Sequence, residues 1–212
     1  MKIDIKGTIC TNDDKEIYEW YGVTSTAPKD VIDKLKEASG QNVDIYINSG
    51  GGEITSAMEI YSALREYNGN IQIHVVGMAA SAASVIMCAA KCDINPTALV
   101  MIHNVSSYTS GDYNEMNKKS QVLQTADRAM CQAYIIKTGR TEKELLEMMN
   151  KETWFTADEA VAFGLCDSIT ESHQLIASYC TILTMEQRKK YSEHFAIPNI
   201  EHRIKKMEEK FK

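Results

Sequence analysis

The sequence lacks the features that mark several large classes of protein. It has no excess of positive charge, and its net charge of −6 argues against nucleic acid as the main ligand, because phosphate binding needs a basic surface. Its longest apolar stretch, residues 75–90, is too short and too rich in Ala and Ser to span a membrane. Residues 1–6 alternate charged and aliphatic side chains, which is unlike a secretory signal. These absences leave an ordinary globular protein, for which 44% hydrophobic and 25% charged residues are typical.

The cysteines form no C-x-x-C pair. Cys88 and Cys92 are close enough in sequence to place two thiols on one helix face, but no second pair of Cys or His residues follows them. We therefore expect no metal site. No other cofactor is expected either. All six cysteines lie in apolar segments, at positions 10, 88, 92, 131, 166 and 180. This pattern predicts buried, reduced thiols in a cytoplasmic protein.

Strand and helix patterns alternate along the first half of the chain. Strands are predicted over residues 3–10, 43–47, 71–76 and 99–102, and helices over residues 28–38, 54–67 and from the small residues after Gly77 to residue 90. This alternation predicts a mainly parallel sheet with right-handed crossovers, which is an α/β fold. Residues at the carboxyl ends of such strands share one crevice.

Three elements whose groups could take part in catalysis come at or just past predicted strand ends. They are the glycine run of residues 50–52, the pair Ser81 and Ser84, and His103. Each has an ordinary structural interpretation: a turn, a tightly packed helix of small residues, and a histidine that only packs. The glycine run also lacks the G-x-x-x-x-G-K-[ST] and G-x-G-x-x-G patterns of phosphate binding. Together they favour serine chemistry, which needs a hydroxyl, a base and backbone N–H groups for an oxyanion.

Four blocks of the sequence resemble the ClpP family of serine peptidases in order and spacing. They are YINSGGG over residues 46–52, GMAAS over 77–81, MIHN over 101–104 and TADEAVAFGLCDSI over 156–169. The resemblance implies a ClpP/crotonase-like α/β fold, with mainly parallel twisted sheets, flanking helices and a protruding handle helix. Within the family, the chain is most similar to the phage and prophage branch, whose members process capsid or scaffold proteins during head assembly.

The resemblance also implies roles for individual residues. Ser81 corresponds to the nucleophile and His103 to the general base, while the backbone N–H groups of Gly52 and Ala82 correspond to the oxyanion donors. Ser84 then becomes a packing residue.

The third member of the triad departs from the family pattern. A match without a gap places the family's Asp at Glu152, so that a longer acid has to orient the imidazole. Thr153 takes this position if the match slips by one residue. Neighbouring side chains of an extended segment point to opposite faces, so only one of the two reaches the imidazole, and we favour Glu152.

A long helix is predicted over residues 113–137, followed by a second one from Thr141 to about residue 150. In the family, a long helix at this place is a handle through which two heptameric rings stack, although the apolar stripe also fits a core helix. The stripe consists of Met116, Leu123, Ala126, Met130 and Tyr134.

We predict a ClpP-like serine peptidase domain over residues 1–170 and a charged, mostly helical C-terminal extension over residues 171–212. No catalytic role is assigned to His74, His173, His194 or His202. The expected protein is an ATP-independent serine endopeptidase that forms homo-oligomeric rings, heptamers or stacked heptamers, and acts on polypeptides such as phage capsid or scaffold protein. Neither nucleic acid nor membrane is an expected partner. The first matched strand begins almost at Met1, which leaves little room for the N-terminal loops that bind an unfoldase.

Two alternatives remain. A crotonase-like acyl-CoA enzyme has this fold, but such enzymes rely on carboxylates where this chain has Ser81 and His103. The other is a ring-forming assembly protein with weak catalysis, for which Glu152 in place of Asp is the hint.

Overall fold

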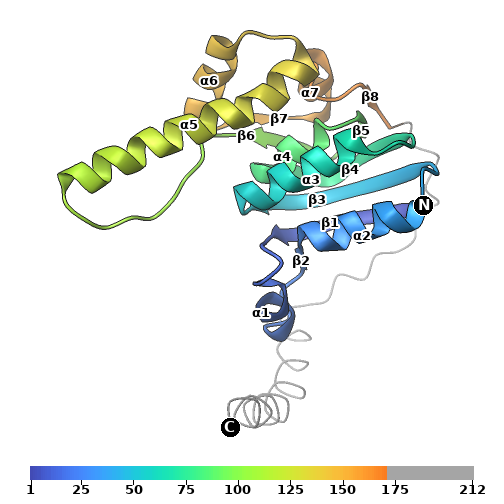
Figure 1. Cartoon of the computed structure of the whole chain (residues 1–212). Coiled ribbons are helices and arrows are strands. Elements are labelled where there is room, and N and C mark those ends of the chain that lie inside the picture. Colours follow the sequence, from blue (N-terminus) through green and yellow to red (C-terminus); the bar gives the residue numbers. More distant parts are fainter. Residues whose placement is uncertain (171–212) are drawn as a thin grey trace, which may run out of the picture. The chain divides into compact units, whose positions relative to one another are not determined.

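The computed structural model describes residues 1–170, so the extension predicted over residues 171–212 lies outside the described residues. Within residues 1–170, eight strands form one sheet with the order β2-β1-β3-β4-β5-β8, and β6 pairs with both β4 and β7 (Figure 1). Every pairing is parallel except that of β6 with β7, as predicted for most of the sheet. The strands are β1 (Lys2–Ile9), β2 (Ser25–Thr26), β3 (Val43–Gly52), β4 (Ile71–Ala80), β5 (Lys91–Ile94), β6 (Leu99–Ile102), β7 (Thr153–Phe155) and β8 (Ser168–Ile169).

Seven helices connect and flank these strands within the same residues. They are α1 (Lys15–Trp20), α2 (Pro28–Ala38), α3 (Ile54–Glu66), α4 (Ala82–Met87), α5 (Tyr113–Thr138), α6 (Glu142–Asn150) and α7 (Ala157–Phe163). Local chemistry sets their ends. Asp112 accepts from the N–H groups of Asn114 and Glu115 at the start of α5, and Gly139 ends this helix in the left-handed conformation.

One part of the core, which continues to α4, α5, α6 and α7, lies between one face of the sheet and the helices α2 and α3. Alternate residues of the central strands are buried, as expected for a sheet covered on that face. They meet the apolar faces of the two helices, on which Val31 and Ile60 are fully buried. The buried strand residues are Ile3, Ile5, Ile45, Ile47, Ile73 and Val75. This packing fixes the strands rigidly and leaves their carboxyl ends free to carry a site.

The glycine run is part of a strand rather than the predicted loop. β3 continues through Gly52, whose neighbour Gly51 pairs with Thr8 of β1. A Cβ atom on Gly52 would lie only 2.1 Å from the carbonyl oxygen of Ile9. Side chains would therefore prevent this close pairing, and the glycines permit the strand to continue.

The strand before Ser81 is also longer than predicted. The sequence predicts a turn at Gly77, whereas β4 runs on to Ala80 and the chain turns at Ser81. A Cβ atom on Gly77 would lie 2.5 Å from Oδ1 of Asn48, so this glycine permits close strand contact instead. α4 is correspondingly shorter than predicted, and the unpredicted strand β5 follows it.

The long helix α5 has two different halves. Its C-terminal half packs into the core, where Met130 and Tyr134 are buried. Its N-terminal half extends away from the sheet (Figure 1), and Tyr113 and Met116 are exposed there. The prediction of a core helix therefore holds for the C-terminal half, and the N-terminal half protrudes as predicted.

Five of the six cysteines lie within the described residues, and all five are buried and unbridged. Cys92 belongs to β5, so it does not share a helix face with Cys88. Across residues 1–170, none of the helices has both the length and the apolar character that a bilayer span requires.

We expect Tyr134→Phe to lower the free energy of unfolding by about 1 kcal/mol, because it removes a buried hydrogen bond. The hydroxyl oxygen of Tyr134 lies 2.7 Å from Oγ of Ser84 and joins α5 to α4. Urea denaturation of the two proteins measures the difference.

Tyr61→Phe is the matched control for this substitution. The hydroxyl of Tyr61 is buried but has no hydrogen-bond partner among the described residues. Its removal should leave stability unchanged or raise it. Equal losses in the two variants would contradict the structural role of the Ser84–Tyr134 contact.

Candidate active site

Ser81 occupies a sharp turn between β4 and α4. Its φ of 54° and ψ of −125° lie outside the regions that residues with a side chain usually adopt. Such a conformation costs on the order of 1–3 kcal/mol and is maintained only by the surrounding structure. Here the N–H group of Ser81 donates to the carbonyl oxygen of Met101 in β6 at 3.0 Å. The turn presents the hydroxyl at the end of the sheet, a geometry that strand-to-helix turns bearing a nucleophilic serine also have.

His103 follows directly after β6 and contacts this hydroxyl. Its Nε2 atom lies 2.7 Å from Oγ of Ser81, and the ring is half-buried. β6 pairs with β4 in parallel, with Met101 opposite Ala80, so the two strands bring the residues together. A hydroxyl bonded to an imidazole can transfer its proton to the ring and become a nucleophile.

The glycine run passes against the turn at Ser81. A Cβ atom on Gly51 would lie 2.8 Å from Cβ of Ser81 and 3.0 Å from the backbone nitrogen of Ala82. Ala82 is the first residue of α4, so its N–H group has no acceptor within the helix. Gly52, at the end of β3, is exposed. Two backbone segments without bulky side chains thus border the Ser81 hydroxyl.

Ser84 is fully buried and stabilises the turn at Ser81 from the core side. Its Oγ donates to the carbonyl oxygen of Ser81 at 2.6 Å and contacts the hydroxyl of Tyr134. It faces the core, so of the two serines in this stretch only Ser81 contacts His103.

Glu152 and His103 each lie one residue outside the pairing of β6 with β7, and the carboxylate of Glu152 is bonded elsewhere. The last pair of this antiparallel ladder is Ile102 with Thr153, and Glu152 lies in the turn before β7 rather than in the extended segment that the sequence predicts. Glu152 has a φ of 50° and an exposed side chain, and its Oε1 accepts from Nε1 of Trp154 at 3.2 Å. Within residues 1–170, Nδ1 of His103 has no hydrogen-bond partner.

The alternative at this position, Thr153, is already bonded. Its hydroxyl donates to the carbonyl oxygen of Met148 at 2.8 Å. Both groups are thus hydrogen-bonded to partners other than His103.

Asp127 is a neighbour of the site that the sequence did not reveal. It is buried on α5, and its Oδ1 accepts from the N–H group of Val105 at 2.6 Å. Burial raises the pKa of Asp127, while the Val105 hydrogen bond and the charge of His103 lower it in part. The signal in the sequence is a carboxylate next to Ala126, within the apolar stripe of the helix.

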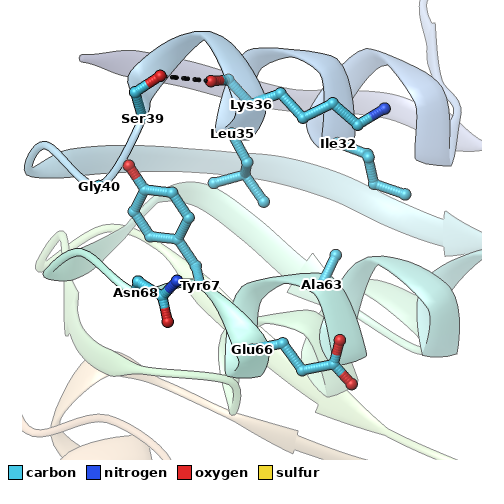
Figure 2. Close-up of a pocket in the computed structure, with 9 residues that line it drawn as sticks. All are labelled: Ile32, Leu35, Lys36, Ser39, Gly40, Ala63, Glu66, Tyr67 and Asn68. Carbon is cyan, nitrogen blue, oxygen red and sulfur yellow. Dashed lines mark hydrogen bonds between the residues drawn. The ribbon is translucent and has the colours of Figure 1, made fainter.

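Other features lie apart from Ser81 and His103. The hollow drawn in Figure 2 is formed by α2, α3 and the turns that follow them, and Leu35 and Tyr67 line it. None of the candidate residues lines this hollow. His74 belongs to β4, where its Nδ1 lies 2.9 Å from a carboxylate oxygen of Asp93. His173, His194 and His202 lie outside the described residues.

Comparisons with known proteins show the family of this chain. A family model described as Clp protease matches residues 14–173. "ATP-dependent Clp protease proteolytic subunit 1" of Leifsonia xyli subsp. xyli (strain CTCB07) is 31% identical over 144 residues, which are 66% of this chain and 73% of that protein. "ATP-dependent Clp protease proteolytic subunit 2" of Tropheryma whipplei (strain Twist) is 30% identical over 132 residues, 61% and 73% of the two chains.

The solved structure of a ClpP1 mutant from Listeria monocytogenes is similar as well. It superposes with a TM-score of 0.67 at 19% identity, and the match covers 81% of this chain and 92% of that chain. The predicted ClpP-like α/β fold is thereby confirmed.

We expect Gly51→Ala to lower the free energy of unfolding by about 1–3 kcal/mol, because an added Cβ meets backbone at a positive φ. The φ of Gly51 is 96°, and its Cβ would lie 2.8 Å from the carbonyl oxygen of Ala80. At Gly50, the nearest atom is Cε of Met78 at 3.6 Å, so Gly50→Ala should be nearly neutral. Chemical denaturation distinguishes the two, and similar stabilities would refute the close approach.

Proposed function

Because the chain belongs to the Clp protease family, we propose that it is a serine endopeptidase that cleaves polypeptides with Ser81 and His103. The observation that carries this proposal is the 2.7 Å contact between Oγ of Ser81 and Nε2 of His103. Neither a crotonase-like acyl-CoA enzyme nor an assembly protein with weak catalysis is favoured by the family match.

In the proposed reaction, Oγ of Ser81 attacks the scissile carbonyl carbon while Nε2 of His103 accepts the hydroxyl proton. The carbonyl electron pair moves to oxygen, which the N–H groups of Gly52 and Ala82 receive. When the tetrahedral intermediate collapses, the C–N bond breaks and the leaving amine takes the proton from His103. A water molecule then attacks the acyl-enzyme in the same way and releases the second product.

We propose Glu152 as the group that orients the imidazole. Its place directly before Thr153, which pairs with Ile102 just before His103, supports this role. The carboxylate has to rotate from Nε1 of Trp154 to Nδ1 of His103, and the extra methylene of Glu gives it reach. The chemical step needs no metal or nucleotide, since a hydroxyl, an imidazole and backbone N–H groups suffice for acyl transfer.

The biological setting is proposed from the family. The two relatives are named ATP-dependent, whereas we propose that this chain acts on its own, as a homo-oligomeric ring that processes phage capsid or scaffold protein. The exposed N-terminal half of α5 supports the handle role in ring stacking. We assign the peptidase domain to residues 1–170 and an extension to residues 171–212. Five buried, unbridged thiols support a reducing compartment such as the cytoplasm.

Replacing the proposed nucleophile tests the chemistry directly. A fluorophosphonate probe should label the wild-type chain, and Ser81→Ala should abolish this labelling because the reacting oxygen is lost. Ser107→Ala is the control, since Ser107 is exposed after His103 and outside the proposed machinery. Labelling that persists in Ser81→Ala, with both variants folded by circular dichroism, would refute the assignment.

The proposed substrate needs a separate test. The purified chain, without ATP, should cleave a purified phage capsid or scaffold protein at defined positions, as mass spectrometry of the products would show. The Ser81→Ala protein is the matched control. Cleavage only after addition of ATP and an unfoldase would contradict independent action but not the serine mechanism.

A further inference from the structure

Asp127 is the only charged side chain among the buried residues that the structure describes. Its relative exposure is 8%, and the other buried polar side chains are those of serines and a threonine. A buried carboxylate is costly unless hydrogen bonds or an opposite charge compensate it. Packing alone therefore does not explain why a carboxylate occupies this position.

The contacts of this carboxylate point to the candidate site. Oδ1 accepts from the N–H group of Val105 at 2.6 Å, two residues beyond His103 in the segment that leaves β6. This bond attaches that segment to α5, in the half of the helix that is packed into the core. The backbone on both sides of the imidazole is thus held, by β6 before it and by Asp127 after it.

The charges around Asp127 are few. His103 is the group whose positive form interacts favourably with the carboxylate. Cys131, one turn further along α5, is the other ionisable neighbour, and burial first, then Glu142 and Asp127, raise its pKa to about 11. The thiol is therefore neutral near pH 7, and His103 is the neighbour that can carry a charge opposite to that of Asp127.

We propose that Asp127 is a positioning residue for His103, which anchors the segment after β6 and stabilises the imidazolium that forms when Ser81 gives up its proton. This inference rests on the proposed serine peptidase function. The field of a buried carboxylate is less screened than that of an exposed one. Asp127 thus supplies a fixed charge, whereas the exposed Glu152 is free to reorient.

Asp127→Asn separates the charge from the anchor, because the Asn side chain has the same shape and its Oδ1 can still accept from Val105. We expect the rate of fluorophosphonate labelling to fall about tenfold. We also expect the acid limb of the pH profile of the labelling rate to move to lower pH by about half a pH unit or more, because the His103 imidazolium loses a stabilising charge. If the role of Asp127 were purely structural, the substitution would leave the acid limb at the same pH.

Two further variants complete the experiment. Asp127→Glu keeps the charge, so it should retain the wild-type acid limb even if the longer side chain slows labelling. Glu147→Gln removes one charge from an exposed position on α6 and should change neither rate nor pH profile. If Asp127→Asn does not fold, an acid limb of Asp127→Glu that moves to lower pH overturns the proposal.

The outcomes distinguish this inference from the proposed function. If Ser81→Ala abolishes labelling but Asp127→Asn has the wild-type rate and profile, only the role of Asp127 is refuted. If the wild-type chain shows no labelling that depends on Ser81, the proposed function fails and the inference fails with it.

Discussion

The candidate site depends on the pairing of β4 with β6. This short parallel ladder aligns Ala80 with Met101, and its last hydrogen bond runs from the N–H group of Ser81 to the carbonyl oxygen of Met101. The ladder therefore ends at the two residues that meet, since Ser81 and His103 each follow soon after their strands. The strained backbone at Ser81 is tolerated because strands on both sides of β4 fix the chain up to Ala80.

The central features of the fold could be predicted from the sequence, because strong periodicity and strand-end residues carry them. Aliphatic alternation in β3 and β4 and the apolar faces of α2 and α3 are local patterns that tertiary packing preserves. The contact between Ser81 and His103 follows from the rule that parallel strands bring their carboxyl ends together. The strand β5 was not predicted because it has only four residues, two of them charged.

Features that depend on close approach or burial could not be predicted in the same way. The local sequence predicts a turn at the glycines, and only the pairing of Gly51 with β1 shows that β3 continues. Asp127 reads as a solvated charge on a long helix, because burial depends on how α5 packs against the segment after β6. The pairing of β6 with β7, whose ends lead to His103 and Glu152, is likewise tertiary, although the family resemblance singles out Glu152.

The hydrogen bond from Ser84 to the carbonyl oxygen of Ser81 has a geometric consequence. That carbonyl and the N–H group of Ala82 belong to one planar, trans peptide unit, so they point in opposite directions. A contact that fixes the direction of the carbonyl oxygen therefore also fixes the direction of the N–H group. Ser84, itself in contact with the hydroxyl of Tyr134, holds this oxygen with both its hydroxyl and its N–H group, and so directs the N–H group of Ala82 away from them. The direction of the Ala82 N–H bond is thus set from the interior, by a residue that a substrate cannot touch.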